Sequence, residues 1–269
     1  MSSTDTFARV VIDAATEQPG HELLRKLATG EVAVVVLRNL LPEEAFTKNR
    51  ERIGELFANA STTSYSNGTL TTIGPYLAKH LSDLDTYFQE SKDAQAMLDG
   101  VSFDLAERVR EGLRKAFGLD SLEPAREPDG REYAASVVRI HADGVRNPLH
   151  NDNIMRDAAD TGIVLAGLAQ QLSCVVCVQE CDEGGELRIY RRPWQPEDET
   201  FKIEGGLGYD EGVVEGHPGH EFKPQAGDVY VINPMQYHSI ERVSGSDRIT
   251  MGFFLGFADE ELGSAVVWG

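Results

Sequence analysis

The hydrophobic pattern of this chain changes its period once, near residue 130. Before that point, apolar residues recur at helical spacing over about residues 13–29, 42–58, 82–96 and 103–117. After it, β-branched and apolar runs with strand character appear at about residues 133–140, 171–180, 186–190, 228–232, 238–243 and 248–257. Helices followed by strands predict an α+β fold, a barrel or sandwich of antiparallel strands buttressed by N-terminal helices.

The chain shows no internal repeat and no low-complexity linker. Its 269 residues correspond to one or two domains of about 150 residues, and single domains commonly reach about 250. We therefore expect one domain over residues 1–269. Residues 1–125 should be mostly helical support, and residues 130–269 should form the β core.

Charge and hydropathy limit the partners. The 44 Asp and Glu residues outnumber the 25 Lys and Arg residues, and the net charge of −19 disfavours nucleic acid and anionic membranes. The longest apolar stretch near the N-terminus, residues 32–37, is far shorter than the roughly 20 residues of a membrane span. The first residues do not resemble a signal peptide, so we expect a cytoplasmic protein. The oligomeric state stays open.

The three cysteines, Cys174, Cys177 and Cys181, lie within eight residues of each other. A Cys-x-x-Cys pair invites a zinc or iron–sulfur reading. The surrounding residues form an apolar, β-branched run, in which Cys174 and Cys177 have opposite parity and face opposite sides of a strand. Small buried core residues are therefore the favoured interpretation.

Two histidines and one aspartate carry the spacing of a metal site. In His150-Asn151-Asp152 the first and third side chains would project to the same face of a strand. His238 follows 86 residues after Asp152, just after a turn, a strand and a second turn, which would bring it beside the first pair. Two imidazoles and one carboxylate on one face are the ligand set typical of Fe(II) sites that activate oxygen.

A cation lies ten residues beyond His238. The guanidinium of Arg248 is suited to pair with the far carboxylate of a dicarboxylic acid, and the hydroxyl of Thr250, in the same strand parity, would add a hydrogen bond.

Together these four positions resemble the iron(II)- and 2-oxoglutarate-dependent dioxygenases, whose core is a double-stranded β-helix of jelly-roll or cupin-like type. A closer similarity is to the carrier-independent subgroup, which contains the cyanobacterial indole-alkaloid halogenases and, more distantly, the N-succinyl-amino-acid hydroxylases. The segments that carry it are 150–152, 171–173, 184–187, 227–228, 237–238, 248–257 and the tail 265–268.

The resemblance implies that His150, Asp152 and His238 bind Fe(II), that Arg248 and Thr250 hold the cosubstrate 2-oxoglutarate, and that O2 is consumed. It implies hydroxylation of an unactivated C–H bond of a small free-standing molecule, with release of succinate and CO2. The substrate would be an amino acid derivative, a nucleoside or a natural-product intermediate. The halogenases have glycine where this chain has Asp152, a difference that favours hydroxylation over halogenation.

The hydroxyl-rich stretch 61–76 suits either a solvated loop or a substrate wall. In the halogenases that the chain resembles, the corresponding segment lines the substrate pocket, which makes Ile73, Tyr76 and Leu77 candidate substrate contacts. The aperiodic stretch 191–220 is expected to be either a functional lid or disordered.

Other marked residues have plainer interpretations. His141 has an unsuitable spacing for a ligand and is set aside. The remaining histidines are expected at the surface, and four aromatic residues near the C-terminus are expected in the core rather than around a substrate. These residues are His21, His80, His217 and His220, and Phe253, Phe254, Phe257 and Trp268.

Alternative functions stay open at this point. The same oxidant could give desaturation or ring closure, and a catalytically silent sensor of 2-oxoglutarate would keep all four residues. A cupin-like isomerase or a non-oxidative metal-binding protein would also use histidines in a β-barrel, but neither explains an arginine ten residues after His238.

Overall fold

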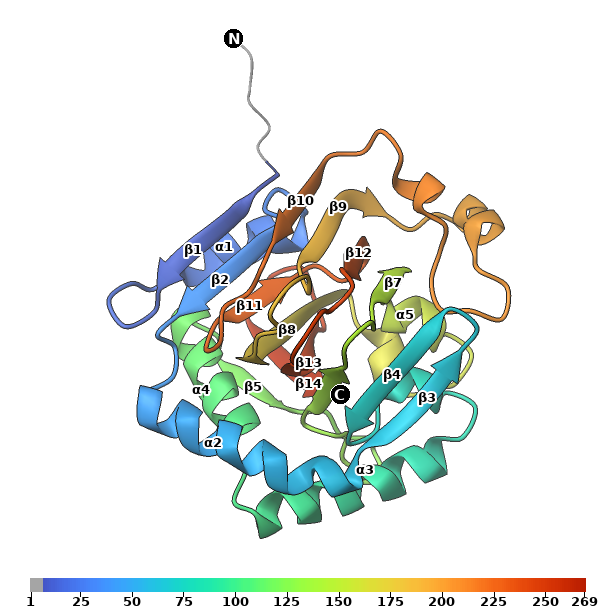
Figure 1. Ribbon diagram of the computed structural model, residues 1–269. Helices are drawn as coiled ribbons and strands as arrows, with labels where there is room; N and C mark the ends of the chain where they lie inside the picture. The colour runs from blue at the N-terminus through green and yellow to red at the C-terminus, as the bar shows by residue number, and fades with distance from the viewer. Residues whose placement is uncertain (1–6) are drawn as a thin grey trace.

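A computed structural model describes residues 7–269 of the chain (Figure 1). Its α-helices are α1 (Gly20–Ala28), α2 (Glu43–Leu56), α3 (Leu84–Gly100), α4 (Leu105–Phe117) and α5 (Ile154–Asp157). Short 3-10 turns cover Phe57–Asn59, Leu77–Lys79, Val164–Gly167, Pro196–Phe201 and Glu211–Val214. The strands are β1 (Arg9–Asp13), β2 (Val34–Arg38), β3 (Ser61–Tyr65), β4 (Gly68–Ile73), β5 (Ser121–Pro124), β6 (Val137–His141), β7 (Asn147–His150), β8 (Gln170–Gln179), β9 (Leu187–Pro193), β10 (Gly219–Phe222), β11 (Val229–Ile232), β12 (Gln236–Ile240), β13 (Arg248–Phe257) and β14 (Ser264–Trp268).

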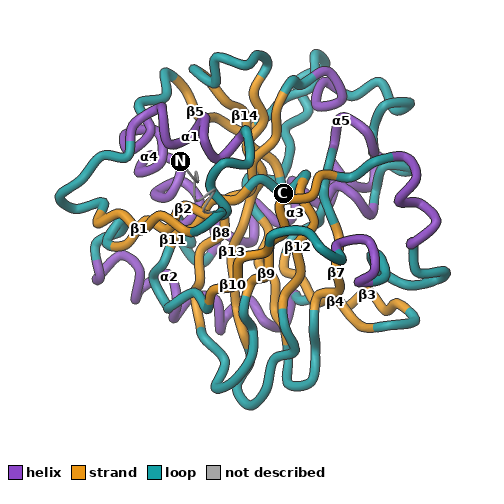
Figure 2. Tube along the Cα trace, turned by 90° about the horizontal axis from the view of Figure 1, so that it is seen from above, coloured by secondary structure: helices purple, strands orange, loops and turns teal. Residues whose placement is uncertain are grey.

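The strands form two sheets. The larger sheet has ten strands, ordered β1-β2-β11-β8-β13-β6-β4-β3, with β14 pairing β13 and β5 pairing β14. The smaller sheet has four strands, ordered β10-β9-β12-β7. Helices α1 to α4 lie together on one side of the molecule, as Figures 1 and 2 show, while the small sheet lies away from them. The α+β prediction is confirmed at this level.

The central strand β8 explains why one face of the large sheet is core and the other faces a cavity. Leu172, Cys174 and Val176 alternate onto the face that packs into the main hydrophobic cluster. Ser173 and Val175, on the opposite parity, line the cavity. The long partner β13 runs antiparallel to β8 and pairs along its whole length, so both strands present the same two faces.

Helix α4 shows how the helical half supports the sheet. Its residues Leu105, Val109 and Leu113 recur at helical spacing and are fully buried in the main cluster. The helix ends at Gly118, whose φ of 70° lies in the left-handed region that glycine adopts without strain. The predicted helices over 42–58, 82–96 and 103–117 are present with shifted ends.

Residues 61–76, expected to form either a solvated loop or a substrate wall, contain the hairpin β3-β4, so the loop alternative is wrong. Its two strands pair with each other, and β4 also pairs with β6. Threonines supply the β-branched side chains that favour extended backbone, so the hydroxyl-rich composition conceals a strand pattern. Strands β1, β5, β10 and β14 were also not predicted from the sequence, and each has only four or five residues.

The cysteine interpretation is confirmed: all three thiols are free and buried. Burial raises the pKa of Cys177 to about 12, so its thiol stays protonated at neutral pH.

The expectation of a surface position for His80 was wrong, since this residue is buried and its ring lies 3.4 Å from the carboxylate of Glu90. Among the described residues, no helix is long and apolar enough to cross a membrane.

Candidate active site

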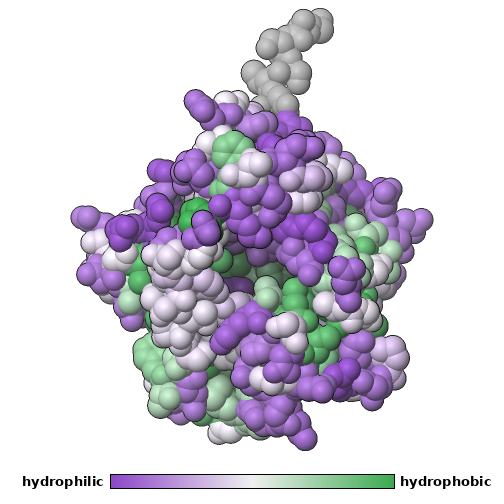
Figure 3. Space-filling model, turned by 90° about the vertical axis from the view of Figure 1, so that its right-hand side faces the viewer, coloured by the Kyte–Doolittle hydropathy of each residue, from purple (hydrophilic) through white to green (hydrophobic). Residues whose placement is uncertain are grey.

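A cavity of about 300 Å³ lies between the two sheets. The large sheet supplies lining residues from β4, β6, β8, β11 and β13, and the small sheet supplies them from β7, β9 and β12. Figure 3 shows a hollow in the surface on the side of β3, β4 and β7. The volume is at the lower end of the range for small-molecule sites, about 300–1,000 Å³.

Strands β7 and β12 bring two histidines together. They pair antiparallel with His238 directly opposite His150, and the two imidazole centroids are 4.2 Å apart. His238 is buried, and the side chain of His150 is 16% exposed. Residues separated by 88 positions in sequence thus occupy one cross-strand pair, as the spacing argument anticipated.

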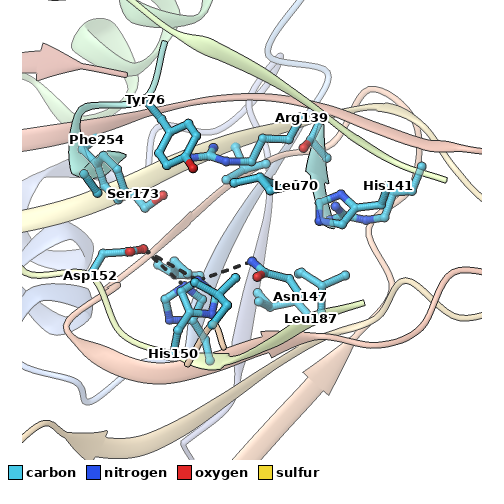
Figure 4. A pocket seen from close by; sticks show the side chains of 18 of the residues that line it. Leu70, Tyr76, Arg139, His141, Asn147, His150, Asp152, Ser173, Leu187 and Phe254 are labelled. Atoms are coloured by element: carbon cyan, nitrogen blue, oxygen red, sulfur yellow. Dashed lines mark hydrogen bonds and ion pairs between the residues drawn. The ribbon is translucent and has the colours of Figure 1, made fainter. Parts of the chain in front are cut away.

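Asp152 completes the cluster from just beyond the end of β7. Its position after the strand corrects the expectation that it shares the strand edge with His150. The backbone N–H of Asp152 donates to the carbonyl of Pro234, and this bond anchors the residue. Its Oδ2 lies 3.9 Å from Nε2 of His150 and 3.7 Å from Nε2 of His238. The three ligand atoms all lie within 4.8 Å of one another, a spacing that suits one metal ion (Figure 4).

Hydrogen bonds orient both imidazoles toward this point. Nδ1 of His150 donates to the carbonyl of Pro148 at 2.7 Å, and Nδ1 of His238 donates to the carbonyl of Gln236 at 2.9 Å. A carbonyl only accepts, so each Nδ1 carries the proton and each Nε2 lone pair is left to face Asp152. Burial lowers the pKa of His238 to about 4, which keeps that ring neutral and able to bind a metal at neutral pH.

Arg248 lies in the same cavity at the start of β13, together with Thr250. Its side chain is buried, and its guanidinium donates a hydrogen bond of 3.0 Å to the hydroxyl of Tyr230. Within residues 7–269 no carboxylate forms an ion pair with Arg248. A buried guanidinium with one neutral partner is costly, and an anion in the cavity would compensate its charge.

His141, which the sequence argument set aside, also lines this cavity. It lies on β6 directly opposite Arg248 on β13, it is 2% exposed, and both of its ring nitrogens lack a hydrogen-bond partner within residues 7–269. Burial and the charge of Arg248 lower its pKa to about 3. The signal in the sequence was the alternation Arg139-Ile140-His141, which places polar side chains on every second residue of a buried strand.

Of the three candidate substrate contacts, Ile73, Tyr76 and Leu77, only Tyr76 is among the residues that line the main cavity. Tyr76 lines the cavity, and its hydroxyl is 2.9 Å from that of Tyr65. Leu77 is buried in a neighbouring apolar cluster and borders a small side cavity of about 70 Å³. Ile73 packs into the main core, because consecutive residues of β4 alternate between the core and the cavity, which Leu70 lines.

Four aromatic residues near the C-terminus were expected in the core. One of them, Phe254, lines the cavity instead. Its ring stacks on Trp268 at 5.5 Å, and Trp268 is fully buried together with Phe253 and Phe257. Phe254 is separated from Arg248 and Thr250 by even numbers of residues along β13. Its side chain therefore projects to the same face of the strand as theirs, toward the cavity.

The candidate lid reaches the cavity through Leu207. The side chain of Asn67, in the β3-β4 turn, accepts a hydrogen bond from the backbone N–H of Leu207 and donates one to its carbonyl, at 2.9 and 2.8 Å. The segment therefore contributes Leu207 to the cavity wall and is hydrogen-bonded to the β3-β4 turn.

Comparison with known proteins gives related sequences. Residues 6–269 match the family described as carrier-protein-independent halogenase WelO5. The chain is 28% identical over 203 residues to L-gamma-glutamyl-L-propargylglycine hydroxylase of Streptantibioticus cattleyicolor, covering 74% of this chain and 72% of the relative. It is 28% identical over 137 residues to L-isoleucine 3(1)-dioxygenase of Pantoea ananatis, covering 49% of this chain and 46% of the relative.

Solved structures share the fold. An N-substituted L-amino acid dioxygenase from Burkholderia ambifaria, crystallised with alpha-ketoglutarate, superposes with a TM-score of 0.58 at 18% identity, covering 92% of this chain and 90% of that chain. The epimerase SnoN of nogalamycin biosynthesis, crystallised with Fe3+ and alpha-ketoglutarate, superposes with a TM-score of 0.51 at 15% identity, covering 82% of this chain and 77% of that chain. Because the family match extends over residues 6–269, this chain belongs to the carrier-protein-independent halogenase WelO5 family.

Proposed function

We propose that this protein is an Fe(II)- and 2-oxoglutarate-dependent oxygenase that hydroxylates an unactivated C–H bond of a small molecule. The observation that carries the proposal is the convergence of His150, Asp152 and His238 in one cavity with the buried Arg248, which pairs with no carboxylate of residues 7–269. The two facing sheets are consistent with a double-stranded β-helix, the core that this enzyme class uses. The relatives that are hydroxylases and dioxygenases support the same reaction class.

The residues fit the two groups that the reaction needs. Two imidazoles and one carboxylate suit Fe(II), because this donor set leaves coordination positions for other ligands. Arg248, the hydroxyl of Thr250 and the unpartnered nitrogens of His141 suit the distal carboxylate of 2-oxoglutarate. Bound together, Fe(II) and 2-oxoglutarate supply an oxidant made from O2, with 2-oxoglutarate converted to succinate and CO2.

The chain itself contributes placement and exclusion of water. The carbonyls of Pro148 and Gln236 fix the rotation of the two imidazoles, and the hydroxyl of Tyr230 fixes Arg248. Phe254 and Leu207 line the cavity with apolar surface, which keeps water away from the bound substrate. Because the position of the substrate decides which C–H bond faces the oxidant, these walls determine the outcome of the reaction.

Asp152 favours hydroxylation within a family whose description names a halogenase. The halogenases that the sequence resembles have glycine at this position, where chloride binds in place of a carboxylate. In this chain the carboxylate of Asp152 faces both imidazoles. The relatives named for amino acids and a dipeptide make an amino acid derivative the favoured substrate class.

The test is turnover of 2-oxoglutarate to succinate, with O2 uptake, when candidate amino acid derivatives are added in excess chloride. We expect a product heavier by one oxygen atom in mass spectrometry. A chlorine isotope pattern in the product would contradict the role of Asp152. Tight binding of 2-oxoglutarate with no turnover of any candidate would favour a sensor, and loss of two hydrogens would indicate desaturation or ring closure.

A further inference from the structure

The cavity is cationic in a protein that is strongly anionic. Its lining includes three permanent cations, Lys79, Arg139 and Arg248, and a single carboxylate, Asp152. The whole chain carries a net charge of −19, so this concentration of positive charge runs against its composition. A cavity lined by one sign of charge raises the local concentration of the opposite sign.

The proposed cofactors account for only part of this charge. Fe(II), the carboxylate of Asp152, the guanidinium of Arg248 and the 2-oxoglutarate dianion together are neutral. The positive charges of Arg139 and Lys79 remain without a compensating negative charge in this set. In the part of the chain that the structure describes, neither side chain forms an ion pair with a carboxylate.

Arg139 lies on the wall of the cavity near Asp152. It borders both the main cavity and the small side cavity, as do Tyr76, Asp152 and Phe254. A Cβ added to Gly252 would lie 3.2 Å from Nη1 of Arg139, so the guanidinium rests on the backbone of β13 where a side chain is lacking. Figure 4 shows Arg139 and Tyr76 on the side of the cavity opposite His150.

Among the described residues that line the side cavity, no unpaired carboxylate is left for Arg139. The second carboxylate of the side cavity, Asp157, is bonded to Nε of Arg156 at 2.6 Å. Lys79, which is exposed, follows Tyr76 in the turn Leu77–Lys79 and lies at the edge of the same space. Two cations, one partly buried and one exposed, therefore border the part of the cavity that Tyr76 lines.

We infer that the substrate is an anion, and that Arg139 receives its carboxylate while Lys79 attracts it at the entrance. The remaining lining residues near this space, Leu70, Leu207 and Phe254, are apolar and suit a hydrocarbon body. This inference rests on the proposed function, because it takes Arg248 as the partner of 2-oxoglutarate. Arg139 is then a specificity-determining residue, with no part in holding the cosubstrate.

The experiment compares matched acids and amides. Enzyme with Fe(II) and 2-oxoglutarate is assayed for succinate formation with N-acetyl-L-leucine and N-acetyl-L-isoleucine, and with the corresponding C-terminal amides. Anaerobic binding of each compound is followed separately through its effect on the visible charge-transfer band of the Fe(II)–2-oxoglutarate complex. We expect the acids to bind and to stimulate succinate formation, and the amides to do neither.

Variants separate the two possible partners of Arg139. Arg139→Gln should weaken binding of the acids by about 30-fold or more, because the substrate carboxylate loses its charged partner in the cavity, and should leave the Kd of 2-oxoglutarate within about twofold. Arg139→Lys should restore part of the acid binding. Arg146→Gln is the matched control, because Arg146 is exposed, lies outside the lining and carries the same charge.

Three results overturn the inference: amides that bind as well as the acids, a panel in which no acid binds, or an Arg139→Gln variant that loses 2-oxoglutarate instead of the acids. The last result would place Arg139 in the cosubstrate site. Absence of the charge-transfer band in the unmodified enzyme would instead reject the proposed function, on which the inference rests.

Discussion

At the scale of single residues, the clearest feature is the buried guanidinium of Arg248, whose surroundings suit a bound anion. Arg248 is 3% exposed, and within residues 7–269 its guanidinium donates a hydrogen bond to the neutral hydroxyl of Tyr230 and forms no ion pair with a carboxylate. Arg248→Ala should therefore weaken 2-oxoglutarate binding by about 2–5 kcal/mol, or roughly 30- to 4,000-fold in Kd, while Fe(II) binding persists. Anaerobic titration of the charge-transfer band measures both. An unchanged 2-oxoglutarate affinity would move the cosubstrate site elsewhere.

The burial of His141 leads to a prediction about how the stability of the protein depends on pH. Its pKa in the folded protein is about 3, against an ordinary value of 6.5, so between these pH values the unfolded chain binds more protons than the folded one. The free energy of unfolding should therefore fall as the pH is lowered through this window, by up to about 1.4 kcal/mol per pH unit from this group.

The non-titrating variant His141→Phe lacks that contribution. Urea unfolding at a series of pH values between 7 and about 3.5 should show a shallower loss of stability than in the parent. Parallel curves for the two proteins would show that folding does not lower the pKa of His141.

At the scale of elements, the turn Gly184-Gly185 before β9 controls the space around Arg248. A Cβ at Gly185 would lie 2.6 Å from Sγ of Cys181 and 3.0 Å from Cδ of Arg248. Gly185→Ala should displace the arginine and weaken 2-oxoglutarate binding by about tenfold or more. The missing side chain at Gly185 therefore leaves room for the side chain of Arg248.

Gly162→Ala is the matched control for that experiment. Gly162 has a φ of 73°, close to the 72° of Gly185, and no atom lies within 4 Å of an added Cβ. Both variants should lose about 1–2 kcal/mol of stability from left-handed backbone strain, measured by urea unfolding. Only Gly185→Ala should lose 2-oxoglutarate affinity, and equal losses in the two variants would contradict a steric effect on Arg248.

The elements differ in how far the sequence could predict them. Long strands such as β8 and β13 have ten residues each and show their apolar character plainly. The short strand β7 has four residues and contains a proline, so its own sequence does not predict a strand. Its extended backbone is held by pairing with β12, where His150 lies opposite His238. Tertiary pairing of this kind leaves no local pattern in a single sequence.

The site was predictable where residue spacing encodes it. His150, Asp152, His238, Arg248 and Thr250 all line one cavity, as the motif spacing anticipated. Residues contributed by neighbouring strands were not identified, because their proximity arises only from sheet register. Arg139 and His141 lie opposite Thr250 and Arg248 across the β6-β13 pair, and Tyr230 reaches the site from β11.

At the scale of the whole molecule, the two sheets separate support from chemistry. One face of the large sheet packs on α1, α2 and α4, and the other forms the cavity with the small sheet. Both histidines of the proposed iron site come from the small sheet, and Arg139 and Arg248 come from the large one. The relative position of the sheets therefore sets the distance between the proposed iron and the anion sites.

The most direct test of this account is anaerobic addition of Fe(II) and 2-oxoglutarate to the protein and to His238→Ala. The parent should develop the visible charge-transfer absorption of a 2-oxo acid chelated to Fe(II). The variant should not, because removal of one imidazole leaves only His150 and Asp152 as ligands. An absorption band of equal intensity and equal 2-oxoglutarate affinity in the variant would contradict the assignment of His150, Asp152 and His238 as the iron site.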